Sequence, residues 1–428
     1  MKYKDTVFGK MPENWNVSTI KEEADVVTDY VANGSFASLS ENVIYRDEES
    51  DAILIRLVDY NNGFQGKFIY IDNHAYNFLS KSKLFGGEII ISNVGANVGT
   101  VFRCPKLSKK MSLGPNAIMV KFRHSDDFYY YWLKSYYGQR MLRSLVTGSA
   151  QPKFNKTNFR EMSIPVPPVP IQIKIATILK SLDDKIELNN AINHNLQQQA
   201  ETIFKKWFID NTRNTEWISG TFSELIESTL NGDWGKDEPI GSSTEKVYCI
   251  RGADIPEVNI GNKGKMPLRY ILPKNLANKK LETGDIVIEI SGGSPTQSTG
   301  RCAAITQSLL DRYNSSMVCT NFCKAIKPKT GYSLYVYYYW KYLYEKGTFF
   351  SYENGTTGIK NLDFNGFIET EPIIIPPFDR IIAFNNYSKS IFDQIFANGR
   401  QSEQLAILRD TLLPRLMNGE IDVSEIEL

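Results

Sequence analysis

Residues 167–208 read PPVPIQIKIATILKSLDDKIELNNAINHNLQQQAETIFKKWF. From Ile175 to Trp207, positions that alternate four and three residues apart are mostly apolar, which is the heptad pattern of a helix that packs along another helix. Pro170 suits the first turn of a helix, and no further Pro or Gly follows before Gly220. A helix over 171–208 would be roughly 57 Å long, so it needs a partner to cover its apolar side.

A matching stretch begins 209 residues later, where Pro376-Pro377 repeats Pro167-Pro168. Both patterns turn polar at the same two steps. Because a buried Asn pairs only with another polar group, this match predicts that the two helices pack on each other with a fixed register and orientation. The second pattern is weaker near Gly399 and Arg409, and the alternative is two unrelated helices, each packed on its own domain. The predicted interface consists of Ile175, Leu179, Leu182, Ile186, Asn189, Asn193, Leu196, Ile203, Ile391, Ile395, Asn398, Ser402, Leu405 and Leu412.

The composition is that of a globular protein. The chain has 428 residues, too many for one core, and 42% of them are hydrophobic and 12% aromatic. No apolar run is long enough for a membrane span and the N-terminus lacks a signal-peptide pattern, so we expect a cytoplasmic protein. The five cysteines form no paired framework, which is typical of a reducing compartment. Cys319 and Cys323 have no nearby His or third Cys, so we expect no metal site.

The net charge of +1 hides two similar swings along the chain. Lys and Arg against Asp and Glu number 7 to 13 in residues 1–80 and 14 to 3 in residues 81–160. They number 3 to 9 in residues 216–262 and 14 to 6 in residues 263–360. Ordinary charge scatter is the alternative, but two swings in register favour two surfaces that bind a polyanion.

The repeat extends beyond the helices. Arg56 and Asp59 correspond to Arg251 and Asp254, and a Gly-acid turn before an apolar strand occurs at Gly87 and again at Gly284. The period near 200 residues indicates a duplicated domain and not a solenoid. Short β-branched strands with modest helices predict α+β domains. We therefore divide the chain into a first domain, a helical spacer, a second domain and a second helical spacer, with bounds 1–166, 167–211, 212–375 and 376–428.

Each copy also contains an aromatic block, residues 128–137 in the first and 335–344 in the second. Aromatic side chains can stack on unpaired bases. At helical spacing they more often form core, and we prefer that interpretation.

A glycine-rich turn precedes each long helix, at residues 147–155 and 354–361. These are either plain turns or places where backbone approaches a nucleic acid, with Lys153 and Lys360 supplying cations. Candidate phosphate contacts are Lys106, Lys109, Lys110, Lys153, Lys156, Lys263, Lys265, Lys279, Lys280 and Lys360. Candidate base contacts, from polar loop residues after the Gly-acid strands, are Asn93, Asn97, Ser294, Thr296 and Gln297.

No catalytic constellation is visible in the sequence. His74, His124 and His194 are scattered, and neither a phosphate-binding Gly-x-x-x-x-Gly-Lys-Ser/Thr loop nor an adenine-methyltransferase Asn/Asp-Pro-Pro-aromatic tetrad occurs. These absences favour a protein that recognises its target without chemistry of its own.

Several motifs resemble the specificity subunit of type I restriction-modification systems. They are Pro12-Glu13-Asn14-Trp15, Phe154-Asn155-Lys156, Ile164-Pro165-Val166-Pro167-Pro168, the Gln172-x-Lys-Ile-Ala-x-Ile-Leu run with Leu182-Asp183-Asp184-Lys185-Ile186, and Leu413 to Ile421. The resemblance implies two duplicated α/β target recognition domains with pseudo-two-fold symmetry, separated by two long antiparallel coiled-coil helices. Each domain would read one half of a split sequence in double-stranded DNA.

The resemblance also implies partners. Two modification subunits would dock on the helices and methylate adenine with S-adenosylmethionine, and restriction subunits would cut DNA using ATP and Mg²⁺. This chain would be non-catalytic and hold no cofactor. The alternative is the recognition module of a methyltransferase-nuclease whose catalytic part is on another chain, which methyl transfer without a partner would favour. A coiled-coil scaffold that binds no DNA fits the charge swings less well.

Overall fold

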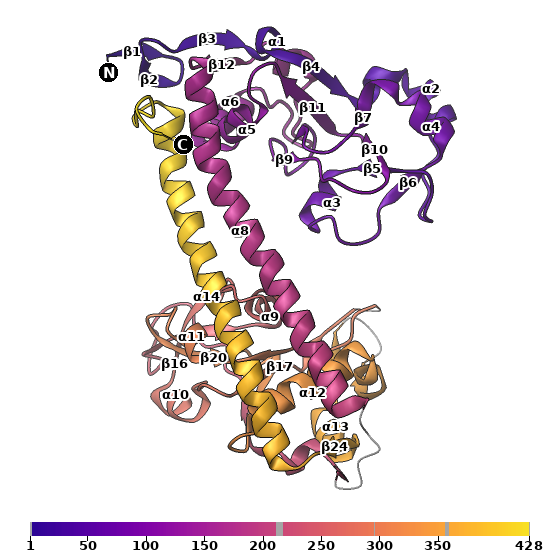
Figure 1. The fold of residues 1–428 in the computed structure, drawn as a ribbon, viewed down its shortest axis with the longest axis vertical. Coiled ribbons are helices and arrows are strands. Elements are labelled where there is room, and N and C mark those ends of the chain that lie inside the picture. The colour runs from indigo at the N-terminus through magenta and orange to yellow at the C-terminus, as the bar shows by residue number, and fades with distance from the viewer. Residues whose placement is uncertain (1, 211–216, 295, 356–358, 428) are drawn as a thin grey trace. The chain divides into compact units, whose positions relative to one another are not determined.

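The computed structural model describes residues 2–210, 217–294, 296–355 and 359–427. The chain forms two compact units: residues 1–184 with 407–428 are the first, and residues 185–406 are the second. The two long helices, α8 (Val169–Phe204) and α14 (Phe378–Met417), each run through both units (Figure 1). The four predicted segments, by contrast, divide the chain at both ends of the first predicted helix and at the start of the second. The bounds of these segments stay a prediction.

The first unit is built on two four-stranded sheets. One has the order β4-β11-β8-β9 and the other β6-β5-β10-β7. Their strands are β4 (Ala24–Asp29), β11 (Ala117–Phe122), β8 (Ile89–Ser92), β9 (Val101–Arg103), β6 (Ile69–Ile71), β5 (Ala52–Ile55), β10 (Lys110–Leu113) and β7 (Lys83–Leu84). The hairpin β1 (Tyr3–Thr6) with β2 (Gly9–Pro12) and the pair β3 (Asn16–Thr19) with β12 (Ser163–Val166) complete it. Its shorter helices are α1 (Ile20–Glu23), α2 (Phe36–Asn42), α3 (Leu57–Asn61), α4 (Asn73–Phe78), α5 (Asp126–Lys134), α6 (Tyr136–Ser144) and α7 (Lys156–Arg160).

The second unit repeats this plan. Its main sheets have the orders β14-β21-β17-β19 and β16-β15-β20, from strands β14 (Ile226–Asn231), β21 (Cys323–Pro328), β17 (Ile286–Glu289), β19 (Cys302–Ala304), β16 (Leu268–Ile271), β15 (Glu245–Ile250) and β20 (Ser316–Cys319). Smaller sheets join β18 (Ser291–Gly292), β23 (Lys360–Leu362) and β22 (Glu353–Asn354), and β13 (Ile218–Gly220) with β24 (Ile373–Ile375). Its shorter helices are α9 (Ile255–Asn259), α10 (Pro273–Lys279), α11 (Gln307–Leu310), α12 (Ser333–Glu345) and α13 (Phe364–Thr370).

The two units match strand for strand where the sequence repeats. The Gly-acid turns lead into β8 and β17, each the third strand of an all-antiparallel sheet of the same order. In the other sheet, β5 pairs in parallel with β10, and β15 pairs in parallel with β20. The predicted duplicated mixed α/β fold is therefore confirmed.

The aromatic blocks lie in the cores, as we interpreted them. Trp132 on α5 and Trp340 on α12 are completely buried in the first and second unit. The same is true of neighbouring rings such as Phe128 and Tyr335. Burial of such large apolar surfaces is a main source of stability in each unit.

Within each unit, α8 and α14 lie side by side and run antiparallel (Figure 1). In the first unit, Asp183 of α8 accepts an ion-pair hydrogen bond from Arg409 of α14 (2.6 Å) and another from Tyr131 Oη of α5 (2.7 Å). In the second unit, the rings of Phe204 and Phe384 are 5.5 Å apart. The apolar pattern thus finds its partner helix in both units.

The polar step of the pattern lies in the second unit, where side-chain hydrogen bonds join the two helices. Asn189 Nδ2 donates to Ser402 Oγ (3.2 Å), and Asn398 Nδ2 donates to Asn193 Oδ1 (2.8 Å). All four side chains are buried. Such bonds exist in only one register, so the helices cannot slide without leaving buried amides unpaired.

Candidate nucleic-acid interface

Two loops that are distant in sequence meet in the first unit. They are the small-residue loop 92–99 after β8 and the glycine-rich turn 147–155. Asn93 Nδ2 donates to Phe154 O (3.0 Å), and Gly95 N donates to Pro152 O (2.9 Å). The half-buried Asn93 is thereby committed to holding the loops together, whereas Asn97 and Lys153 are exposed. Predicted base-contacting and phosphate-contacting residues therefore lie on one paired-loop surface.

The second unit brings together the corresponding loops. Strand β18 pairs with β23, so Gly292 lies opposite Lys360 and Ser291 lies opposite Asn361. In the loop after β18, Ser294 N donates to Gln297 O (2.8 Å), and the exposed Thr296 lies at its tip. Ser294, Thr296 and Gln297 thus lie in a loop beside the strand that carries Lys360, as Asn93 and Asn97 lie in a loop beside the turn that carries Lys153 in the first unit.

Lys360 does not act as an isolated cation. Its ammonium bonds Glu353 (2.7 Å), whose carboxylate also accepts a hydrogen bond from Thr299 Oγ1 (3.0 Å). Although burial favours the neutral acid, the bonds from Lys360 and Thr299 hold the pKa of Glu353 below its usual value. Lys360 therefore brings less net charge to this surface than the exposed Lys153 brings to the other.

The remaining candidate lysines of the first unit lie on other elements. Lys109 pairs with Glu49 (2.8 Å), Lys110 donates to Asn73 Oδ1 (2.9 Å), and Lys156 of α7 pairs with Asp29 (2.8 Å). Lys106 is exposed in the segment that follows β9. Their basic charge is thus spread over the unit and partly neutralised by nearby acids.

In the second unit the other candidates fall into two places. Lys279 of α10 donates to Gly232 O (3.0 Å) beside Asp233, and Lys280 next to it is exposed. Lys263 and Lys265 follow α9, where Lys265 N donates to Asp254 Oδ1 (2.9 Å).

Sequence comparison of the copies aligned Arg56 with Arg251 without giving them a role. Each guanidinium forks onto the carboxylate three residues later, Arg56 with Asp59 (2.8 and 3.1 Å) and Arg251 with Asp254 (2.9 and 3.0 Å). Each carboxylate also accepts from the main-chain N–H of its arginine, which closes the turn. The Arg-x-x-Asp spacing recurs in both copies, and this recurrence is the sequence signal from which the Arg–Asp ion pairs could have been predicted.

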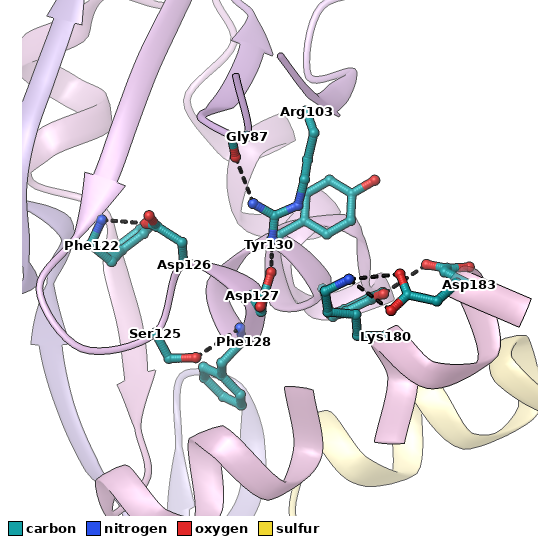
Figure 2. Close-up of polar contacts among 12 residues, drawn as sticks. Gly87, Arg103, Phe122, Ser125, Asp126, Asp127, Phe128, Tyr130, Lys180 and Asp183 are labelled. Carbon is teal, nitrogen blue, oxygen red and sulfur yellow. Dashed lines mark hydrogen bonds and ion pairs between the residues drawn. The ribbon is translucent and has the colours of Figure 1, made fainter. Parts of the chain in front are cut away.

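Another arginine, Arg103, lies beside α5 (Figure 2). It donates to Gly87 O (2.7 Å), pairs with Asp127, and lies 4.4 Å from the ring centre of Tyr130. Burial raises the pKa of the neighbouring Asp126, against the lowering effect of the hydrogen bond from Phe122 N (2.6 Å). These carboxylates border a cavity of about 390 Å³ against α8, but each is engaged in holding the fold.

Among the described residues, no three His, Cys, Asp or Glu side chains are grouped closely enough to hold a metal ion. All five cysteines are buried, and burial raises the pKa of the Cys249 and Cys302 thiols to about 12, so they stay protonated. No helix in the described ranges has the length and apolar character needed to cross a bilayer.

Known proteins with similar sequences are type I restriction enzyme specificity subunits. The family model of the type I restriction modification DNA specificity domain matches residues 12–198. The MjaIX specificity subunit of Methanocaldococcus jannaschii is 24% identical, over 99% of this chain and 97% of that protein. The HindI specificity subunit of Haemophilus influenzae is also 24% identical, over 63% of this chain and 71% of that one.

The fold is shared with a solved structure as well. The crystal structure of the S subunit of a type I restriction-modification system from M. genitalium matches with a TM-score of 0.55 and 16% identity, over 94% of this chain and 96% of that chain. Over nearly its whole length the chain is thus similar to type I restriction enzyme specificity subunits, and residues 12–198 match the DNA specificity domain of that family.

Proposed function

We propose that this chain is the DNA-recognition subunit of a type I restriction-modification complex, in which each domain reads one half of a bipartite target. The observation that carries the proposal is an arrangement that occurs in both units. In each unit, the segment after the Gly-acid strand, β8 or β17, pairs with the glycine-rich segment that precedes the next long helix: Asn93 and Gly95 with 147–155 in the first, and Ser291–Gly292 with residues 360–361 in the second. Duplicated readers suit a target with two halves. The loops differ in sequence between the copies, Asn93-Val94-Gly95-Ala96-Asn97 against residues 292–297, so the two halves can differ.

The long helices supply the second part of the proposal, a fixed gap between the halves and a docking surface for modification subunits. The paired polar step supports the fixed gap because it allows one register. Leu188 and Ile192, four residues apart on α8, are apolar yet 52% and 37% exposed, which is typical of a surface that a partner covers. We propose two modification subunits, with restriction subunits joining them.

The chemistry in this proposal belongs to the partners. S-adenosylmethionine would be held by the modification subunits, and ATP and Mg²⁺ by the restriction subunits, with no cofactor on this chain. The structural engagement of Arg103, Asp126 and Asp127 supports a non-catalytic role.

Mapping N6-methyladenine in DNA tests this function. The chain is expressed with its modification subunits in cells free of other adenine methylation, and methylated sites are read genome-wide. One sequence in two parts, separated by a constant number of unspecified base pairs, is expected, and neither protein alone should methylate. Methylation by this chain alone, or by the modification subunits without it, would contradict the proposal.

Changing Lys153 to Ala should weaken DNA binding without changing the target. Lys153 is exposed on the paired-loop surface, so its loss should remove about one phosphate contact. The slope of the logarithm of affinity against the logarithm of salt concentration should fall by about 1, and affinity should drop about fivefold near 0.1 M salt. Fluorescence anisotropy with the methylated sequence measures both. Lys389→Ala, on α14 where Lys389 is exposed and pairs with Asp393, is the matched control; an unchanged slope for Lys153→Ala would remove it from the interface.

A further inference from the structure

Segment 259–265 of the second unit leads from the end of α9 toward strand β16. It contacts both long helices where their buried polar residues Asn193 and Asn398 lie. Asn193 Nδ2 on α8 donates both to Ile260 O (3.0 Å) and to Ile395 O of α14 (3.0 Å). The side-chain amide of Gln197, one turn further on, donates to Asn259 O. A side chain that sets helix register therefore also holds the recognition domain.

Two glycines make the contact with α14 unusually close. A Cβ atom on Gly399 would lie 1.9 Å from Gly261 O, and one on Gly261 would lie 2.3 Å from Ile395 O. Gly261 also has a φ of +82°, a conformation that side chains disfavour. Backbone rests on backbone here, so no flexible side chain can absorb an added methyl group.

The opposite side of the segment is held by the domain itself. Arg312, whose side chain is 5% exposed, donates to Gly261 O (2.5 Å) and to Glu403 of α14 (2.8 and 3.2 Å). Tyr313 Oη donates to Lys263 O (2.5 Å). Buried, charge-assisted bonds of this kind are among the stronger ones in proteins, so the segment has one defined position.

The far end of the segment is fixed by the Arg251–Asp254 pair. Asp254 accepts from Lys265 N (2.9 Å), and Arg251 donates to Lys265 O (2.7 Å). Lys263 and Lys265, two candidate phosphate contacts, thus stand on a segment anchored by the helices at its start and by the domain at its end.

We propose that Asn193 and Gly399 are positioning residues for DNA recognition by the second domain. Through segment 259–265 they set the placement of Lys263 and Lys265 relative to the helices, so helix register and the orientation of the reader are established by the same contacts. This inference rests on the proposed function, since it matters only if the second domain reads DNA. It also gives a reason for retaining buried amides that cost stability relative to apolar side chains.

The test uses the full chain in complex with its modification subunits. Affinity is measured for the methylated target and for duplexes with one base pair changed in either half. Asn193→Ala and Gly399→Ala should each lose about tenfold of the discrimination against changes in the second half and keep it in the first. Because Ala favours helix over Gly, a loss in Gly399→Ala cannot come from weaker helix formation.

Asn195→Ala is the matched control, since Asn195 is exposed on the same helix and its side chain accepts a hydrogen bond from Gln199, a neighbour on that helix. If the wild-type complex does not discriminate between the duplexes, the proposed function itself fails. If it does and both variants equal the control, or if discrimination falls equally in both halves, the positioning role is overturned. Should either variant fail to fold, Gln197→Ala replaces it, with a second-half loss supporting the role and no loss rejecting it.

Discussion

Replacing Trp340 by Ala is expected to lower the free energy of unfolding of the second unit by about 3–5 kcal/mol. The indole is completely buried, and its ring centre lies 4.7 Å from that of Phe367 and 5.1 Å from that of Phe349. Its Nε1 also donates to Gly300 O (2.8 Å), just before β19. The variant therefore loses apolar burial and leaves a buried carbonyl without its donor.

Urea unfolding followed by circular dichroism measures this loss. Phe36→Ala is the control, because Phe36 is 84% exposed and its truncation should change stability by about 0.5 kcal/mol or less. A Trp340→Ala chain as stable as the control would contradict the packing described for the second core.

Exchanging residues 217–375 for the corresponding part of a type I specificity subunit with a different target should change one half of the methylated sequence completely and leave the other half intact. Several mismatched base pairs at about 1–3 kcal/mol each predict a loss of affinity for the original target of more than about 100-fold. The effect is expected because the second unit has its own core, separate from that of the first.

The exchange must preserve the contacts that join the domain to the helices. These are the half-buried Lys341–Glu201 pair, the Arg312–Glu403 pair and Gly261. Methylation mapping of the chimera gives the readout, with a chimera lacking these residues as comparison. A change in both halves, or in neither, would show that the domains do not read separately.

The long helices could be predicted because a heptad pattern is local and continuous over many turns. The end of the first helix could not be predicted from this pattern. The α-helix ends at Phe204, and the chain continues as a π-helical turn over Lys205–Ile209. That turn accompanies the packing of Phe208 against Tyr335 and Phe384, at 5.0 and 5.2 Å between ring centres. Partners more than 100 residues away leave no trace in a local pattern.

Gly399 illustrates the same limit. In the sequence, Gly399 weakens the apolar pattern. In the structure, glycine is required at this position because a Cβ atom would collide with the main chain of Gly261. Arg409, which lies further along α14 and is also a break in the pattern, pairs with Asp183. Tertiary contacts thus account for both departures from the heptad.

The candidate interface was predictable in its parts and not in its assembly. The repeat indicated loop 92–99 and turn 147–155 separately, but the sequence could not show that they meet, as the bonds from Asn93 to Phe154 and from Gly95 to Pro152 do in the structure. Nor could the sequence show that Lys156 and Lys360 are paired with Asp29 and Glu353. Side-chain pairing depends on distances of a few ångströms, which spacing along the chain does not determine.

The most direct test varies the gap between the two halves of the methylated target. The complex is given duplexes that keep both halves unchanged and lengthen or shorten the unspecified segment one base pair at a time. If helices locked in one register hold two separate readers, affinity should be highest at one gap and fall at least about tenfold when it changes by one base pair. Equal binding at every gap would contradict the central claim.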